Sequence, residues 1–353
     1  MLSTRLASRI AADGPIPFDE FMAACLYDEA GGYFTAGPLR SVAAGDFLTS
    51  PEVSPWFGTM LGRFALGVRR RLGRPGRFRV VEVAAGSGSL LRSLRRELPE
   101  GAQIDAIETS AAARRALRGL LGDDRVHSRM DDLPPRFDGV VIANELMDNL
   151  PVAVAVRAGS GWEERWVGHD ADGFHLVAAP CRPAVARWCD RHAGVVPDDG
   201  IVEVQLAAGE WLRAALGRLG RGAVVVIDYG GTAEELAGRR AEGTLRTYRG
   251  HHLGPDPLLE PGANDITVDV DFGALVAVAE DAGAVTELTT QAAFLEDLGL
   301  RDEIERLRRR ERELAASGET MGRLQVRSEA TDAETLLHPR GLGDFRVLVA
   351  RKG

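Results

Sequence analysis

The chain has 353 residues, of which 45% are hydrophobic and 27% charged, so it can bury a large core and is unlike a fibrous or disordered protein. Its net charge of −9 at pH 7 opposes nonspecific binding to nucleic acid or to an anionic membrane, because the field of the protein repels both. Its three cysteines form no Cys-x-x-Cys pair and no apolar run is long enough to span a membrane, so we expect no metal site and a soluble, cytoplasmic protein.

The first 75 residues are predicted to form a helical cap and lid. Phe18–Tyr27 and Trp56–Val68 show the apolar spacing of helices with one buried face. A stretch rich in glycine and proline, from Gly31 to Pro55, interrupts the helical pattern. We therefore assign residues 1–75 to an N-terminal cap that precedes the main domain.

From Phe78 onward, short apolar runs alternate with helical patterns. The expected strands are Arg79–Ala84, Gln103–Glu108, Arg125–Arg129, Gly139–Ala143, Ala223–Asp228 and Phe345–Ala350. The expected helices are Leu90–Leu98, Ser110–Leu121, Gly209–Leu219, Asp271–Ala282 and 301–316, the last with the charge pattern of a solvated face. This alternation is typical of a mainly parallel sheet with helices on both faces. The fold class is therefore α/β, with a Rossmann-like domain over residues 76–353.

Two segments interrupt the alternation and are interpreted as insertions, at about 152–200 and 232–270. Val152–Ala179 is patterned as antiparallel strands with a turn at Asp170–Gly173. We expect this insertion on the substrate side of the domain. The segment from 232 to 270 is rich in loops.

Two glycines, Gly86 and Gly88, lie between the first strand and a helix. Small residues there let the backbone approach a ligand, although an ordinary tight turn has the same pattern. Glu82 lies at the end of that strand, and Glu108 ends the next strand, where a carboxylate can accept both hydroxyls of a ribose. These acids disfavour the pyrophosphate of a dinucleotide. They favour S-adenosylmethionine, which has no phosphate and carries positive charge.

The loops after the third and fourth strands hold further candidates. Asp131 is placed where a contact with adenine is expected, although an acid in a surface loop is nearly as consistent with the sequence. Glu145 and Asp148 follow the fourth strand at the reactive edge of the sheet. If the chain continues as a helix there, they share one face and can hold a cationic nucleophile. The alternative is a helix capped by Asn144, with both acids in solvent.

Several motifs along the chain occur in the order of a known family. They are Gly14-Pro15-Ile16, Gly32-Tyr33-Phe34, the block from Gly45 to Ser54 (GDFLTSPEVS), Asn144-Glu145 with Asp148, Ile227-Asp228-Tyr229-Gly230, Gly243-Thr244-Leu245 with Tyr248 and His251, Asp265-Ile266-Thr267, and Gly341-Leu342-Gly343-Asp344-Phe345. By these motifs the chain resembles the MidA family of class I methyltransferases over nearly its whole length. The resemblance implies a mainly parallel seven-stranded sheet and S-adenosyl-L-methionine as cofactor. It also implies methylation of protein arginine, the activity of the family's mitochondrial member in the assembly of respiratory complex I.

The resemblance implies cofactor contacts beyond the glycine turn. The segment that contains Gly45, Thr49 and Ser50 should fold over the cofactor, and Asn144 should lie beside it. One position departs from the family here, because Ala84 stands where glycine is usual.

On the substrate side, the resemblance implies roles for Tyr33, Asp228 and Tyr229, although Tyr229 can equally pack under the lid. His251 is expected as a base, or else as a solvated loop residue. Asp269 is also assigned to the substrate side. It stands where the family usually has histidine, so the substrate can differ.

We therefore predict an S-adenosylmethionine-dependent methyltransferase that methylates arginine on a protein or peptide, with Glu145, Asp148 and His251 as catalytic residues. Carboxylates can orient a guanidinium group, which is a poor nucleophile because its pKa lies above about 12. One alternative is N- or O-methylation of a small molecule or peptide natural product. Another is a nonenzymatic assembly factor that keeps the fold. Neither nucleic acid nor membrane is expected as a partner, and the oligomeric state is not predicted.

Overall fold

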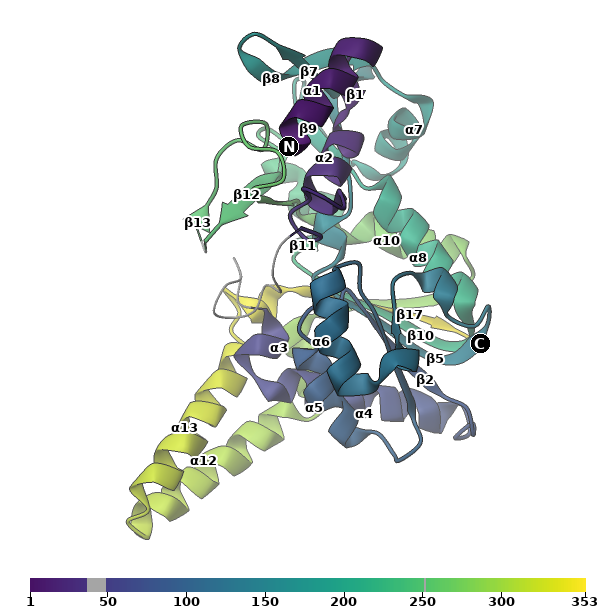
Figure 1. Cartoon of the computed structure of the whole chain (residues 1–353). Helices are drawn as coiled ribbons and strands as arrows, with labels where there is room; N and C mark the ends of the chain where they lie inside the picture. Colours follow the sequence, from purple (N-terminus) through teal and green to yellow (C-terminus); the bar gives the residue numbers. More distant parts are fainter. Residues whose placement is uncertain (37–48, 251) are drawn as a thin grey trace.

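The computed structural model describes residues 1–36, 49–250 and 252–353 (Figure 1). The α-helices are α1 (Leu2–Asp13), α2 (Phe18–Tyr27), α3 (Ser50–Val53), α4 (Pro55–Arg71), α5 (Ser89–Glu97), α6 (Ala111–Leu121), α7 (Pro183–His192), α8 (Leu206–Arg218), α9 (Ala233–Leu236), α10 (Phe272–Asp281), α11 (Gln291–Asp297), α12 (Leu300–Ala316) and α13 (Thr320–Thr335). Short 3-10 helices are η1 (Asp123–Arg125), η2 (Met130–Asp132), η3 (Met147–Asn149), η4 (Ala237–Arg239) and η5 (Leu342–Asp344).

The strands belong to one large sheet and several smaller ones. Those of the main sheet are β2 (Arg79–Val83), β3 (Gln103–Ile107), β4 (Val126–His127), β5 (Phe137–Asn144), β10 (Leu219–Asp228), β16 (Val285–Thr290) and β17 (Arg346–Lys352). The others are β1 (Ile16–Pro17), β6 (Ala153–Ala158), β7 (Gly161–Asp170), β8 (Gly173–Pro180), β9 (Ile201–Val204), β11 (Gly230–Gly231), β12 (Arg246–Arg249), β13 (His252–Leu253), β14 (Asp265–Thr267) and β15 (Val270–Asp271).

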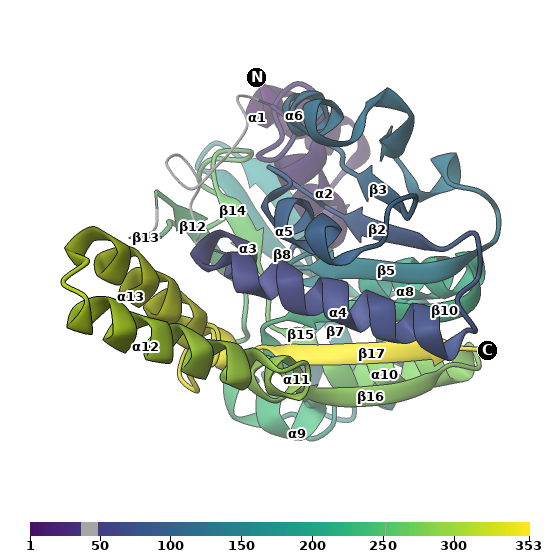
Figure 2. The ribbon, with the colours of Figure 1, turned by 90° about the horizontal axis from the view of Figure 1, so that it is seen from below.

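Over the described part of the chain, the main sheet has seven strands in the order β16-β17-β10-β5-β2-β3-β4 (Figures 1 and 2). Strand β17 runs antiparallel to both β10 and β16, and the other pairs are parallel. The expected mainly parallel, seven-stranded sheet is therefore confirmed. The chain steps outward from β2 to β4 and then returns to place β5 on the other side of β2. Ligands bind at such a reversal of strand order, beyond the carboxyl ends of the strands.

Helices cover both faces of this sheet because its central strands are apolar on both sides. In β5, Val140 and Ile142 pack on one face with helices α4 and α5, whereas Val141 and Ala143 pack on the other with α8 and α10 (Figure 2). Successive side chains of a strand point to opposite faces, so an unbroken apolar run predicts a strand buried on both sides.

The expected antiparallel insertion is also present. Strands β6, β7, β8 and β9 pair antiparallel in a second sheet, and the β7–β8 connection falls at the predicted turn between Asp170 and Gly173. Strand β1 of the N-terminal region joins this sheet by pairing with β7.

Residues 1–75, expected as one cap, are divided between two parts of the molecule. Helices α1 and α2 pack against the inserted sheet in one hydrophobic cluster, at the top of Figure 1. Helix α4 instead packs on the main sheet and on α5. The division follows from the apolar faces, because each helix buries its own stripe against a different sheet.

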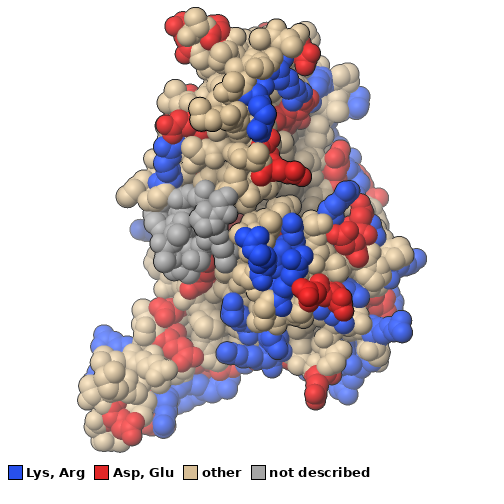
Figure 3. All heavy atoms as spheres, viewed as in Figure 1, with Lys and Arg blue, Asp and Glu red and all other residues tan. Residues whose placement is uncertain are grey.

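The C-terminal part contains elements that the sequence pattern did not reveal. Helices α12 and α13 form an antiparallel hairpin that extends away from the main sheet (Figures 1 and 2). Basic and acidic side chains are interspersed along its visible face (Figure 3). Helix α13 and strand β16 were not predicted, because each is largely polar. No helix in the described ranges is long and apolar enough to cross a membrane.

The contact between α4 and α5 gives a test of the packing. A Cβ atom on Gly58 would lie 2.2 Å from the Ser93 Oγ and 2.6 Å from the Leu90 carbonyl oxygen. We expect Gly58→Val to lower the free energy of unfolding by about 1–3 kcal/mol through overpacking, measured by urea denaturation. Gly67→Ala in the same helix meets only the end of the Arg71 side chain and should raise stability by up to about 1 kcal/mol. Equal effects of the two substitutions would contradict this packing.

Candidate active site

A cavity of about 940 Å³ lies beyond the carboxyl ends of β2, β3, β5 and β10. The predicted site residues that line it are Tyr33, Thr49, Glu82, Gly86, Glu108, Asn144, Glu145, Asp148 and Tyr229. Ser50, Gly88, Asp131, Asp228 and Asp269 do not line it. The predicted Gly45 and His251 lie outside the described residues. Segments distant in sequence thus meet in one cavity, as expected where the strand order reverses.

Hydrogen bonds to Glu108 stabilise the glycine turn at one end of the cavity. Its Oε2 accepts the Gly86 backbone N–H at 2.9 Å, and its Oε1 accepts the Ser110 backbone N–H at 2.8 Å. Gly86 has φ +50°, in the left-handed region that favours glycine. Gly88 has φ +75° and packs closely on helix α6, since a Cβ atom there would lie 2.9 Å from the Leu117 side chain. The carboxylate therefore joins the turn to the start of α6.

Ala84 also adopts left-handed backbone geometry, with φ +57°. This geometry costs alanine more than glycine. The departure from the family pattern at this position is thus a strained backbone at the end of β2.

Glu82 is buried at the end of β2, and its pKa lies well above the usual value because of desolvation and the nearby Glu108. Its Oε2 atom has no hydrogen-bond partner among the described residues, and the same holds for the Oδ1 atoms of Asn144 and Asp148. Buried oxygens of this kind are costly unless a ligand supplies donors or positive charge. Their chemistry fits a cationic ligand such as S-adenosylmethionine.

Glu145 follows β5 in a backbone turn with φ +51°, so the chain does not continue as an α-helix there. The condition under which Glu145 and Asp148 would share one helix face is therefore not met. A carboxylate oxygen of Glu145 accepts the Asn144 side-chain amide at 3.1 Å. Burial, with a further contribution from Asp148, raises the pKa of Glu145 to about 8.

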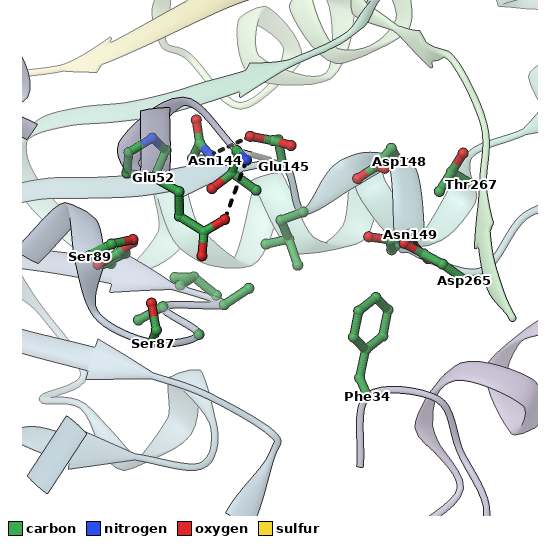
Figure 4. A pocket seen from close by; sticks show the side chains of 18 of the residues that line it. Phe34, Glu52, Ser87, Ser89, Asn144, Glu145, Asp148, Asn149, Asp265 and Thr267 are labelled. Carbon is green, nitrogen blue, oxygen red and sulfur yellow. Dashed lines mark hydrogen bonds between the residues drawn. The ribbon is translucent and has the colours of Figure 1, made fainter. Parts of the chain in front are cut away.

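Figure 4 shows how the acids are distributed along the cavity. Glu145 lies with Glu52 and Asn144 near the glycine turn, whereas Asp148 lies toward the other end. There the Tyr229 hydroxyl donates to the Asp148 Oδ2 at 2.6 Å. Burial raises the pKa of Asp148, and this hydrogen bond opposes the rise. The two acids thus occupy successive positions along one cavity.

Asp228 supports this end from beneath and is fully buried. Its Oδ2 accepts the backbone N–H groups of Met147 and Asp148 at 2.9 and 3.3 Å, and its Oδ1 accepts that of Tyr229 at 3.0 Å. The expected contact between Asp228 and substrate is therefore corrected. Its carboxyl group faces the backbone, because those N–H groups would otherwise be buried without acceptors.

Three other side chains that were predicted to contact the cofactor or the substrate do not line the main cavity. The Asp131 side chain is 66% exposed and pairs with Arg218, because η2 turns it outward while Met130 lines the cavity. The Ser50 hydroxyl donates to Gln291 at 3.1 Å, away from the cavity. Asp269 is buried between Arg239 and Arg246 and lines a separate, smaller cavity.

The sequence prediction missed a wall of the cavity at its far end. Tyr27 from α2 donates its hydroxyl to the Asn149 carbonyl at 3.1 Å, and the Asn149 amide donates to Asp265 Oδ1 at 2.8 Å. Phe34 points toward the same end (Figure 4). Asn149 and Asp265 adjoin or belong to the recognised motifs, which was the available signal. Among the described residues, no cluster of His, Cys, Asp and Glu is suited to a metal ion.

Comparisons with known proteins agree with this geometry. A family model described as putative S-adenosyl-L-methionine-dependent methyltransferase matches residues 60–290, more than half of the chain. The chain belongs to this family. It is an S-adenosyl-L-methionine-dependent methyltransferase, and the predicted cofactor and class I fold are confirmed.

Relatives and solved structures support the same assignment. A likely methyltransferase of the COG1565 superfamily from Burkholderia thailandensis, bound to S-adenosylhomocysteine, superposes with a TM-score of 0.84 and 31% identity over 99% of this chain and 92% of that one. Mitochondrial protein arginine methyltransferases NDUFAF7 are similar in sequence. The Danio rerio protein is 27% identical over 84% of this chain and 76% of its own length, and the Homo sapiens protein 29% over 84% and 72%.

These relatives correct the expected localisation. The sequence predicted a cytoplasmic protein, but the matching arginine methyltransferases are mitochondrial proteins, so the cytoplasmic prediction is not supported. The lack of a long apolar run could not reveal this, because it does not distinguish one aqueous compartment from another.

The role of Glu108 in the methyltransferase can be tested by calorimetry. Glu108→Ala removes the acceptor that holds the Gly86 and Ser110 N–H groups, so we expect the affinity for S-adenosylmethionine to fall by about 10- to 100-fold. Asp131→Ala is the matched control, because that acid lies outside the cavity, and should change the affinity less than about twofold. Similar losses in both variants would contradict the placement of the two acids.

Proposed function

We propose that this methyltransferase transfers a methyl group to the guanidinium group of an arginine in a protein or peptide. The observation that carries the proposal is the presence of two carboxyl groups, the half-buried Glu145 and the buried Asp148, in succession along the cavity from the glycine turn. The name of the relatives, protein arginine methyltransferase, supports the same acceptor. Net charge −9 and the interspersed surface charges in Figure 3 favour a protein partner over nucleic acid or an anionic membrane.

The residues near the glycine turn would hold the cofactor. S-adenosylmethionine supplies a methyl group on a positively charged sulfur. Glu82 would bind its cationic end through the oxygen that lacks a protein partner, and Glu108 would accept the ribose hydroxyls beside Gly86. Asn144 and Thr49 line the same part of the cavity.

Glu145 and Asp148 would bind and orient the acceptor. Methyl transfer is an in-line displacement, and holding the two reactants close and aligned can supply much of the rate. A guanidinium group is planar and donates in a fixed fork, so carboxylates can hold two of its nitrogens and leave the third toward the methyl group. Withdrawing positive charge toward the carboxylates increases the nucleophilicity of that nitrogen. The proton lost after transfer can pass to a carboxylate or to water.

Aromatic side chains complete the proposed acceptor site. Phe34, Tyr229 and Tyr248 line the cavity together with Asp148. An arginine side chain is stabilised by the faces of such rings and by carboxylates at its end. A neutral acceptor would bring no positive charge to these two carboxylates, and this distinguishes the proposal from methylation of an uncharged metabolite.

A small cationic acceptor remains the second candidate, because a cavity of about 940 Å³ has room for the cofactor and a further small molecule. The experiment that separates the two uses S-adenosylmethionine with an isotopic methyl label and cell extract. After acid hydrolysis of the protein fraction, labelled methylarginine is the result expected. Label found only in small molecules would overturn the proposal, and no transfer to any acceptor would favour a nonenzymatic assembly factor.

The ionisation of Glu145 gives a pH test. Only the carboxylate form pairs with guanidinium, so kcat/KM for an arginine peptide should rise as pH increases through the Glu145 pKa near 8. Glu145→Gln should lower kcat/KM by about 100-fold and abolish that inflection. A profile that keeps its inflection near pH 8 in this variant would assign the titration to another group.

The support from Asp228 gives a separate test of positioning. Asp228→Asn replaces one acceptor oxygen with an amide that cannot accept, so Asp148 or Tyr229 should shift. We expect kcat to fall by about tenfold or more, while the calorimetric affinity for S-adenosylmethionine changes less than about threefold. A parallel loss of cofactor affinity would indicate general unfolding instead.

A further inference from the structure

A second cavity, of about 270 Å³, adjoins the acceptor end of the main one. Tyr229, Gly341 and Phe345 line both cavities. The rings of Tyr229 and Phe345 pack edge to face with centroids 5.7 Å apart, so they form a common wall. A substrate whose arginine enters the main cavity therefore has its neighbouring residues within reach of the second.

The second cavity is built around the buried Asp269, which holds two arginines. Its Oδ2 pairs with Arg239 and its Oδ1 with Arg246 at 3.1 Å. Of this pair, Arg239 lines the second cavity together with Asp269, whereas Arg246 lines the main cavity. The Arg239 side chain is 51% exposed while Asp269 is 3% exposed, so the arginine is presented outward and the acid is not.

Arg340 adds a further positive charge to the lining of this cavity. It is exposed, and within the described ranges its guanidinium group forms no ion pair. The other acid in the lining, Asp344, is paired with Arg346, which also binds Glu235. The lining of the second cavity thus contains two arginines and two aspartates, and Arg340 is its arginine without an ion pair in the described ranges, whereas acids predominate in the lining of the main cavity.

We infer that the second cavity binds a carboxylate carried by the acceptor on a residue next to the methylated arginine. This inference rests on the proposed function. Arginine recognises carboxylates through paired, charge-assisted hydrogen bonds, and Arg239 is already fixed in place by Asp269. The methyltransferase thus selects an acceptor with alternating charge, in which a cationic side chain enters one cavity and an anionic side chain enters the other.

The test uses end-capped peptides in which one arginine is flanked by glutamate, glutamine or lysine. We expect wild-type kcat/KM at low salt to be about three- to tenfold higher for the glutamate peptide than for the glutamine peptide, and lowest for the lysine peptide. The preference should weaken as salt increases, because the rim arginines are exposed. Arg340→Glu should reduce the glutamate-to-glutamine ratio to about one or below.

The matched control is Arg327→Glu on α13, which changes the net charge equally but does not line either cavity. It should leave the ratio unchanged. A glutamate-to-glutamine ratio of kcat/KM near one in the wild type, or the same ratio in Arg340→Glu as in the wild type, would overturn the inference. Methylation of the peptides would still support the proposed function in that case. If the wild-type protein binds S-adenosylmethionine and methylates none of the three peptides, the proposed arginine acceptor fails, and this inference fails with it.

Discussion

The burial of carboxyl groups at the ends of adjacent strands is the constraint on which the site depends. Glu82, Glu108, Asp148 and Asp228 are all less than a tenth exposed. Burying an acid costs free energy unless it is protonated or receives hydrogen bonds. Backbone N–H groups bind both oxygens of Glu108 and Asp228, whereas Glu82 and Asp148 each keep an oxygen without a partner among the described residues. In the proposed function, a cationic cofactor and a cationic acceptor would supply what these two acids lack.

The main sheet fixes the position of the strand ends that carry these acids. Its central strands are packed on both faces by helices, so the backbone at the strand ends cannot shift without opening a close-packed core. The reversal of strand order between β2 and β5 places the glycine turn beside Glu145. Backbone strain at Ala84 and Glu145, both with positive φ, is held at the two strand ends that border this reversal. Strain of this kind persists only where the surrounding structure over-determines it.

Charge organises the acceptor side in a different way. In the main cavity Asp148 accepts a hydrogen bond from the neutral hydroxyl of Tyr229, but in the adjoining cavity Asp269 is paired with Arg239 and Arg246. The aspartate that departs from the family pattern therefore acts as an anchor for arginines. Its negative charge holds Arg239 in the lining of the second cavity and Arg246 in the lining of the main one. The wall between the cavities separates a lining rich in acids from one that presents the exposed Arg239 and Arg340, and this is the basis for the inferred selection of an acceptor by charge.

The sequence by itself determined the α/β class, the central strands, the glycine turn and the acids Glu82, Glu108, Glu145 and Asp148, because apolar periodicity and strand-end position are local properties. Only the tertiary structure decided which polar side chains face the cavity. Asp131 and Asp228 follow strands as Glu108 does, yet one turns to solvent and the other caps backbone N–H groups. Tyr27 and Asp265 both contact Asn149, although the three residues lie far apart in the chain. Side-chain direction in a loop is set by such long-range contacts, which leave no periodic trace in the sequence.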